Sequence, residues 1–394
     1  MNEWTHWASQ SRRKLDVLRH VDGWIVLAVA AVCLCGLVFI GSATRDDALF
    51  SAQQGRQGLF VACGLGLGFF VLLPHYVHLM RLSWFFYGAT VLALLGLPLF
   101  APEINGARRW YAFPGFSIQP SEFAKLAVVL ALAALLRFKS RAHTFDGLFL
   151  PMLVVAVPAL LILRQPDLSS ALVLGPVLLA MCYAAGASGR SILLVVGIGA
   201  ALAVFAYFEL MHDYQQERVS VWLQHWSWSD ADLHKIEVRQ VLRDAGYQPW
   251  QSLIALGSGG LTGYGLGQGP QNRYDFLPYR SEDYVFAVVG EETGWLGCLL
   301  VLGCIAAVVF GLLWVAARTR ERYGRLVCVG VAAWIGAQSL CHVAVCGWLV
   351  PSTGLPMPLV SYGGSSTWAG LLGLAICLNI GARREPILAA DGFR

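Results

Sequence analysis

A carboxylate at the end of a long polar stretch is the residue in this sequence best placed to do chemistry. Asp283 closes that stretch, and the apolar run Tyr284–Val289 follows directly. Because a carboxyl group at an apolar boundary is poorly solvated, its pKa rises, which suits a general base. The same position could be the N-cap of the next helix. Asp283 is therefore predicted to be a catalytic base or a helix cap.

Two irregular segments accompany this acid. Glycines recur through Gly257–Gly269, just before Gln271, and they allow close approach of the backbone to a ligand or to another segment. Their spacing matches no phosphate-binding P-loop. The second segment, Pro351–Ser366, contains Ser361 and cannot be a regular helix, so it must be buried in protein or line a wet cavity. Gln271 and Ser361 are accordingly candidates for substrate binding.

Further charged side chains lie at the ends of other apolar runs, where charge is costly and therefore often functional. The guanidinium groups of Arg108 and Arg109 suit a diphosphate, although lipid headgroups are an alternative partner. Glu122 and Lys125 share one helix face, so they form either a packing ion pair or one wall of a polar cavity. Asp167 is a helix cap or a cavity residue. All five are candidates for substrate binding.

Composition defines the class of protein that must hold these residues. The chain is 57% hydrophobic and 13% charged, whereas a soluble domain carries roughly 25% charge. Apolar runs of about 18 residues or more then indicate a membrane protein, with lipids and no nucleic acid among its partners. The ten cysteines are scattered singly without zinc-ligand spacing, which is typical of small buried hydrophobes. No cleavable signal peptide is evident, so the first apolar run is predicted to be a retained helix.

The apolar runs predict an all-α polytopic fold of about ten transmembrane helices. They are expected near residues 23–43, 58–76, 82–101, 120–137, 147–164, 168–187, 191–210, 284–316, 326–348 and 366–382. The predicted organisation is a tail at 1–22, a membrane domain at 23–382 and a second tail at 383–394.

Lysine and arginine in the short loops predict the orientation. Basic clusters lie in the N-terminal tail, after the fourth and eighth spans, and at the start of the C-terminal tail. Their members are Arg12, Arg13, Lys14, Arg19, Arg137, Lys139, Arg141, Arg318, Arg320, Arg322, Arg325, Arg383 and Arg384. With ten spans all four clusters fall on one side, which the positive-inside rule makes cytoplasmic. Both termini are therefore predicted to be cytoplasmic.

The opposite face then receives a long polar loop at 211–283, and long ordered loops are usually functional. Its segment Asp232–Asp244 has apolar residues among charges and could be an amphipathic helix at the membrane surface. Four tryptophans of the loop fit an interfacial aromatic belt, and simple anchoring is the favoured interpretation. They are Trp222, Trp226, Trp228 and Trp250.

Taken in order along the chain, these groups resemble the SEDS family, the RodA, FtsW and SpoVE group. The segments that carry the resemblance are Asn105–Trp110, Gln119–Lys125, Gln165–Leu168, Gly257–Gly260, Phe276–Gly294 and Pro351–Ser366. The resemblance covers nearly the whole chain, from about residue 20 to 384. A single motif would be weak, but the ordered set is highly specific.

The resemblance implies ten transmembrane helices, with the long extracytoplasmic loop between the seventh and eighth. It implies a peptidoglycan glycosyltransferase of the bacterial cytoplasmic membrane, which polymerises lipid II and works with a class B penicillin-binding protein transpeptidase. The family's catalytic acid aligns with Asp283, but Tyr279–Glu282 replaces the usual Glu-x-His-Thr before it, and Glu282 could alter the pKa of the acid. No fixed cofactor is implied, although Mg²⁺ or Mn²⁺ could offset charge on the leaving diphosphate.

The sequence leaves alternatives open. Asn105–Trp110 looks more like FtsW, the division paralogue, while Gly269–Gln271 and Tyr274–Pro278 look more like RodA, the elongation paralogue, which we favour. A flippase or transporter of lipid-linked precursors would use the same polar cavity, but it usually has paired midplane breaks in its helices. The unusual residues here cluster on one face, which favours the enzyme. A pure scaffold would leave the acid at an apolar border unexplained.

Overall fold

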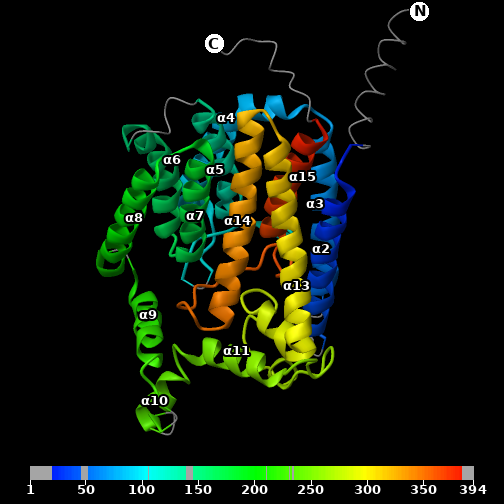
Figure 1. Ribbon diagram of the computed structural model, residues 1–394. Coiled ribbons are helices and arrows are strands. Elements are labelled where there is room, and N and C mark those ends of the chain that lie inside the picture. The colour runs from blue at the N-terminus through cyan, green and yellow to red at the C-terminus, as the bar shows by residue number, and fades with distance from the viewer. Residues whose placement is uncertain are drawn as a thin grey trace, which may run out of the picture.

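The computed structural model describes residues 20–45, 52–104, 106–138, 145–209, 211–229, 231–232 and 235–383. Several residues named above lie outside this part of the chain, namely Arg12, Arg13, Lys14, Arg19, Asn105, Lys139, Arg141 and Arg384. The described residues form a bundle of long helices with a layer of short helices across one end (Figure 1).

A long helix occupies each of the ten apolar segments that the sequence predicts. These helices are α2 (Gly23–Ala43), α3 (Gln53–Leu72), α4 (Tyr76–Phe100), α5 (Pro120–Leu136), α6 (Phe145–Leu163), α7 (Leu168–Ala185), α8 (Gly189–Glu209), α13 (Val285–Arg318), α14 (Arg322–Cys346) and α15 (Gly364–Ala382). Among the described residues, eight of them are long and apolar enough to cross a membrane, and Gly147–Leu163 is a shorter apolar helix. The all-α polytopic fold is confirmed, and the count of ten spans stays a prediction.

Helix α3 begins earlier than the apolar pattern predicts, because its polar first turns are satisfied by another helix. The Gln57 side chain donates to Thr367 Oγ1 at 2.9 Å and accepts the backbone N–H of Gly363 at 3.1 Å. A buried amide with partners on both of its polar atoms carries little desolvation cost. Hydropathy alone misses such a start.

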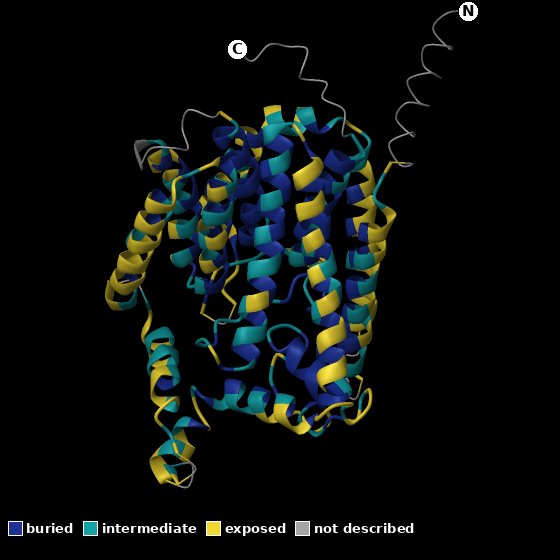
Figure 2. Cartoon of the chain, in the orientation of Figure 1, coloured by how far each residue is buried: buried dark blue, intermediate teal, exposed yellow. Residues whose placement is uncertain are grey.

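Helix α5 is the centre of the bundle. Pro120 lies in its first turn, where the missing N–H would be unpaired anyway, and the alanine- and leucine-rich sequence that follows favours a helix. It packs against α4, α6, α7, α14 and α15. Almost all of its residues are therefore buried, in contrast to the exposed outer helices (Figure 2).

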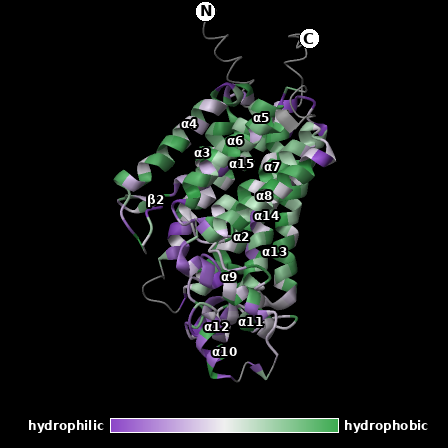
Figure 3. Cartoon of the chain, turned by 90° about the vertical axis from the view of Figure 1, so that its left-hand side faces the viewer, coloured by the Kyte–Doolittle hydropathy of each residue, from purple (hydrophilic) through white to green (hydrophobic). Residues whose placement is uncertain are grey.

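The outer helices expose apolar side chains. On α8, Leu193 and Phe208 are 71% and 69% exposed. The long helices consist mostly of hydrophobic residues, whereas hydrophilic residues gather around the short helices at one end (Figure 3). Exposed apolar area of this extent, on helices of this length, is a lipid-facing surface.

The predicted long loop contains α9 (Asp213–His225), α10 (Ile236–Val241), α11 (Tyr247–Ser258) and α12 (Pro270–Arg273). Helix α10 lies in the predicted amphipathic segment but is only six residues long. A hydrophobic cluster holds this layer together. Its members include Val221, Trp222, Trp228, Val238, Leu242, Trp250 and Trp348. Three of the four loop tryptophans thus pack within the layer itself, whereas Trp226 is exposed.

The glycine-rich segment packs closely against helix α13. That helix is kinked at Gly294, whose φ of 62° and ψ of −161° are not helical. A Cβ at Gly294 would lie 2.5 Å from the carbonyl carbon of Leu261 and 2.6 Å from the amide nitrogen of Gly263, so only glycine fits there. The structure therefore shows the close approach between segments that the glycines allow.

A two-stranded hairpin before α5 was not predicted from the sequence. Strands β1 (Tyr111–Phe113) and β2 (Phe116–Ile118) pair antiparallel, with Tyr111 opposite Ile118. The rings of Phe113 and Phe116 stack with centroids 5.2 Å apart. The hairpin places the polar start of α5 next to the N-terminus of α15, where Gln119 N–H donates to Ser365 Oγ at 2.9 Å.

Candidate active site

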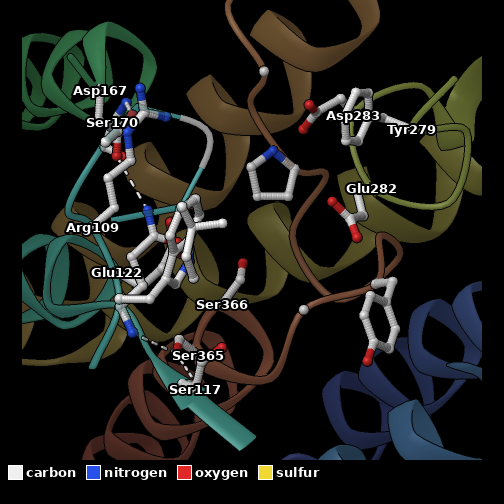
Figure 4. A pocket seen from close by; sticks show the side chains of 18 of the residues that line it. Arg109, Ser117, Glu122, Asp167, Ser170, Tyr279, Glu282, Asp283, Ser365 and Ser366 are labelled. Carbon is white, nitrogen blue, oxygen red and sulfur yellow. Dashed lines mark hydrogen bonds between the residues drawn. The ribbon is translucent and has the colours of Figure 1, made fainter. Parts of the chain in front are cut away.

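A pocket of about 980 Å³ lies between the helix bundle and the polar layer. Most of its lining comes from residues 104–119, 166–170, 214–219, 279–284 and 351–366. Asp283 and Glu282 lie on one side of it, and Arg109, Asp167 and Glu122 lie on the other (Figure 4). The pocket therefore brings together acids and bases from parts of the chain that are far apart in sequence.

The irregular segment between α14 and α15 forms part of the pocket wall. Its backbone is held from the α14 side, where Gln338 Nε2 donates to Pro356 O at 2.8 Å and a ring nitrogen of His342 lies 2.7 Å from Leu355 O. Leu355 and Met357 are buried in the core, while Thr353 and Gly354 line the pocket. Both predicted uses of this segment, burial in protein and lining of a polar cavity, are confirmed. His342 itself is buried, and both of its ring nitrogens have backbone partners, Leu355 O and the N–H of Phe286.

A tight turn positions the acid pair. Tyr279 has a φ of 53°, and its carbonyl oxygen accepts the backbone N–H groups of Glu282 at 3.1 Å and of Asp283 at 2.9 Å. Helix α13 begins at Val285 with Tyr284 in the N-cap position. Asp283 is therefore not the cap of this helix, and its side chain is directed into the pocket instead (Figure 4).

Three neighbouring elements hold this turn. Arg280 Nε donates to Ala43 O at the end of α2, at 2.6 Å. Ser281 Oγ donates to Gln53 Oε1 at the start of α3, at 2.9 Å, and Ser281 O accepts the N–H of Tyr362 at 2.8 Å. The residues that replace the usual family sequence before the acid thus make their own set of anchors.

The surroundings of Asp283 favour the protonated form of its carboxyl group. Within the described part of the chain, no hydrogen bond or ion pair engages its carboxyl oxygens. The pKa of Asp283 is raised to about 7: burial raises it most, the neighbouring Glu282 and the more distant Asp167 also raise it, and Arg218 and Arg109 lower it. Burial also raises the pKa of Glu282. A carboxyl group that titrates near neutral pH suits proton transfer.

Asp167 is both a helix cap and a pocket residue. Its Oδ1 accepts the N–H of Ser170 at 3.1 Å, which caps α7, and the hydroxyl of Ser169 at 2.9 Å. Its Oδ2 accepts Gln119 Nε2 and Ser121 Oγ, both at 3.2 Å. The two readings of this residue are therefore compatible, although its oxygens are already occupied by donors.

The two adjacent arginines point to different places. Arg109 lines the pocket, and its Nε and Nη2 donate to the backbone oxygens of Gln165 at 2.7 Å and Pro166 at 2.6 Å. Arg108 does not line the pocket. Its Nη1 donates to Pro98 O at 2.7 Å, and its Nη2 lies 3.7 Å from Glu103. The structure thus places Arg109 in the pocket across from Asp283 and leaves Arg108 exposed ahead of strand β1.

Glu122 and Lys125 form a buried ion pair with a third partner. Lys125 Nζ lies 2.7 Å from Glu122 Oε1 and 2.8 Å from Gln338 Oε1, and the two charged side chains are 2% and 0% exposed at Glu122 and Lys125. Trp334 Nε1 donates to the same Gln338 oxygen at 2.7 Å. Glu122 lines the pocket and Lys125 lies behind it. The pair therefore connects the pocket wall to α14.

Gln271 and Ser361, the other predicted substrate-binding residues, lie outside the pocket lining. The Gln271 backbone N–H donates to Glu291 Oε1 at 2.7 Å, at the start of α12. Ser361 Oγ accepts the N–H of Met357 at 2.8 Å and is buried. Both residues support the loops next to the pocket. Sequence proximity to the irregular segments could not distinguish support from lining.

The long loop contributes pocket residues that the sequence analysis did not single out. Tyr214, Gln215 and Arg218 line the pocket from α9. The one available signal was that Arg218 lies in the long loop 211–283, which the sequence places on the same side of the membrane as Asp283. Without knowledge of how α9 packs, Arg218 was indistinguishable from the other arginines of the loop.

The side chains of the described residues provide no group of three or more histidines, cysteines, aspartates or glutamates that could hold a metal ion. Mg²⁺ and Mn²⁺ prefer several oxygen ligands. Among the described acids of the pocket, unengaged oxygens come from the adjacent Glu282 and Asp283 and from Glu122, which lies on the other side of the pocket (Figure 4). The residues therefore do not fit a protein-built metal centre. All ten cysteines are free, and six of them are buried, as expected for small hydrophobes.

Comparison with known proteins identifies the family of this chain. Residues 23–385 match the FtsW/RodA/SpoVE family model, described as cell cycle protein. A probable peptidoglycan glycosyltransferase FtsW of Geobacter metallireducens is 33% identical over 92% of this chain and 94% of that protein. The peptidoglycan glycosyltransferase MrdB of Escherichia coli K12 is 30% identical over 93% of this chain and 95% of that protein.

Solved structures agree with these relatives. A chain from a peptidoglycan synthase complex that coordinates polymerization and crosslinking matches with a TM-score of 0.76 and 29% identity, covering 93% of this chain and 99% of that one. The rod shape determining protein RodA of Thermus thermophilus matches with a TM-score of 0.67 and 30% identity, covering 92% of this chain and 97% of that one.

Proposed function

This chain belongs to the FtsW/RodA/SpoVE family, and we propose that Asp283 is the general base with which it polymerises lipid II. The chain is a multi-pass membrane protein and a peptidoglycan glycosyltransferase, in agreement with relatives of both the FtsW and the MrdB kind. Because the two kinds are nearly equally similar, the choice between division and elongation stays a proposal, and we keep the elongation role.

The observation that carries the proposal is the unengaged carboxyl group of Asp283 in a polar pocket, with a pKa of about 7. In the proposed reaction a sugar hydroxyl of one lipid-linked disaccharide attacks the anomeric carbon of another. A new C–O bond forms, the bond from that carbon to the diphosphate oxygen breaks, and the lipid diphosphate leaves with the electron pair. Asp283 accepts the hydroxyl proton.

The place of the pocket suits a substrate with a lipid tail. The pocket lies between the apolar bundle and the polar layer, so a diphosphate-sugar headgroup could occupy it while its tail stays in the bilayer. A transporter would need access from both faces, whereas the polar groups described here gather at one end of the bundle. That distribution supports the enzyme over the flippase.

We expect purified full-length protein to convert labelled lipid II in proteoliposomes into glycan polymer. The products are separated by size, and dye-labelled lipid is followed for movement between leaflets in the same vesicles. Lipid movement without polymer would support the transporter instead, and neither product would support a scaffold. Asp283→Asn protein, prepared in parallel, reports polymer made by any contaminating enzyme.

A class B penicillin-binding protein is the proposed partner. The similarity to a chain of a peptidoglycan synthase complex supports a two-protein assembly. The polymerisation assay is therefore run with and without a cognate transpeptidase of this class, and a higher rate in its presence is expected.

The proposed location is the bacterial cytoplasmic membrane, with both termini in the cytoplasm. Arg137 and Arg383 follow the ends of α5 and α15, and Arg318 is the last residue of α13, whereas the pocket lies toward α9–α12. The positive-inside rule then puts the pocket outside the cytoplasm.

A fluorescent protein that folds only in the cytoplasm should therefore glow when fused after Arg394, and alkaline phosphatase inserted after Asp244 should be active. Phosphatase activity from a fusion after Arg394 would contradict this topology. Western blots of both fusions control for expression.

A further inference from the structure

Helix α9 belongs to the polar layer and lines the pocket, to which Gln248 of α11 also contributes. The α9 residues in the lining include Tyr214, Gln215 and Arg218. None of the sequence motifs includes them. With 13 residues, Asp213–His225 is too short to cross a membrane. Its position beside the acid pair therefore needs an explanation of its own.

One face of α9 is anchored at both of its ends. Gln215 Nε2 donates to Pro166 O at 3.2 Å near the start. Near the end, the His225 ring stacks on Trp348 with centroids 4.3 Å apart and an interplanar angle of 11°, and Val221 is 5% exposed. Residues at these spacings share one helix face. Arg218 lies between the two anchors on that face, so its backbone is held in place at the pocket.

Three of the described arginines line the pocket, and they differ in how many of their donors are engaged. Arg109 uses two nitrogens on backbone oxygens of the turn between α6 and α7. Arg56 is exposed at the start of α3. Arg218 makes one long hydrogen bond, from Nη1 to Ser352 O at 3.4 Å, and is only partly exposed. Of the three, Arg218 is the one that is both held by its helix and available to a ligand.

We propose that Arg218 binds the diphosphate of the lipid-linked sugar in this pocket, and this assignment rests on the proposed function. A guanidinium group offers five N–H donors in a planar fork that matches phosphate oxygens. The proposed reaction places new negative charge on the leaving diphosphate while Asp283 takes a proton. A fixed cation in the same pocket stabilises that charge where it develops. Neither Arg108 nor the engaged Arg109 supplies this from its observed position.

The test measures binding of three probes to full-length protein in nanodiscs: undecaprenyl diphosphate, undecaprenyl monophosphate and inorganic pyrophosphate. Arg218→Gln should weaken undecaprenyl diphosphate about 10- to 100-fold, the usual loss when a hydrogen bond to a charged group is removed. The monophosphate should be affected less. Arg218→Lys keeps the positive charge but loses the planar guanidinium fork. Its affinity for undecaprenyl diphosphate should therefore lie between that of the wild type and that of Arg218→Gln.

Arg243→Gln is the matched control. Arg243 is an exposed arginine of the same loop and does not line the pocket, so its replacement removes the same charge without removing a ligand contact. Equal effects of Arg218→Gln and Arg243→Gln would overturn the proposal, because they would indicate only the general field of the loop. Tight pyrophosphate binding that needs Arg218, with no gain from the lipid tail, would identify a free diphosphate as the ligand and overturn the lipid-linked assignment.

Kinetics provide a second, independent readout. The charged groups that face or share the pocket with Asp283 are Glu282, Arg218, Asp167, Arg109, Arg56 and Glu122. Because Arg218 lowers the pKa of Asp283, Arg218→Gln should move the acid limb of the pH–rate profile to higher pH. Because Glu282 raises that pKa, Glu282→Gln should move it to lower pH. A structural defect alone would not shift the two profiles in opposite directions.

The outcomes separate the two claims. If wild-type protein polymerises lipid II and Arg218→Gln keeps its ratio of diphosphate to monophosphate affinity, the Arg218 assignment is wrong and the proposed function stands. If wild-type protein makes no polymer but loses diphosphate affinity in Arg218→Gln, the proposed function is wrong and the binding site stands. Both affinities are measured on the folded protein alone, so a lower yield of the variant does not change their ratio.

Discussion

Replacing Asp283 by asparagine should lower the rate of lipid II polymerisation by about 10²–10⁴-fold, the usual cost of losing a general base. Asparagine keeps the size of the side chain and cannot accept a proton. The turn at Tyr279 is held by backbone hydrogen bonds to Glu282 and Asp283, which the substitution leaves unchanged. The variant should therefore fold and keep its binding to the transpeptidase.

Thermal unfolding gives this prediction a second arm. Burial and Glu282 hold the pKa of Asp283 at about 7, well above its usual value, so the ionised form is disfavoured in the folded protein. A raised carboxyl pKa costs stability as pH rises past the unfolded value and through the folded one. Asp283→Asn removes that cost, and its melting temperature at pH 8 should equal or exceed that of the wild type.

The wild-type rate should rise with pH through about 7 and level off above it, since only the ionised carboxyl accepts a proton. Asp244→Asn is the control for the mutant series, because Asp244 is exposed in the same loop and does not line the pocket. Near-normal polymerisation by Asp283→Asn would exclude its role as the base and direct attention to Glu282 or Asp167.

The sequence predicted those features that local physics determines. Long apolar runs located the helices, the expected span at 120–137 agrees with α5, and Asp167 was recognised as a possible cap of α7. Asp283 stood out because an acid at an apolar border is unusual. Each of these features depends on residues that are close in sequence, so one chain was sufficient to find it.

Features that depend on packing between distant segments were not predictable in the same way. Arg218 lies in the pocket because α9 is held there by contacts with distant segments, the His225 ring on Trp348 and the Gln215 side chain on Pro166 O. Conversely, Gln271 was grouped with the site because of its place in the chain. It lies outside the pocket lining, and its backbone N–H donates to the Glu291 carboxylate. No pattern within either segment records which face a loop helix turns toward the bundle.

Removing the cation of the buried ion pair should cost more stability than any other single change proposed for this chain. Lys125→Ala leaves Glu122 buried without its partner, and breaking a buried pair this way costs about 3–5 kcal/mol. The second oxygen of Glu122 already lacks a partner within the described residues, so no alternative donor is at hand. Gln338 also loses a contact, and Gln338 holds Pro356 in the pocket wall.

Unfolding in detergent, followed by circular dichroism, measures this loss, and three comparisons identify its cause. Lys235→Ala breaks an exposed pair with Asp232 and should cost far less stability than Lys125→Ala, because solvent screens an exposed pair. The double variant Glu122→Gln with Lys125→Met removes both charges and should recover much of the stability, because no unpaired charge stays buried. If the double variant is stable but polymerises lipid II poorly, the pair also shapes the pocket, as expected from Glu122 lining it. A Lys125→Ala protein with wild-type stability and activity would show that the pair is peripheral to both.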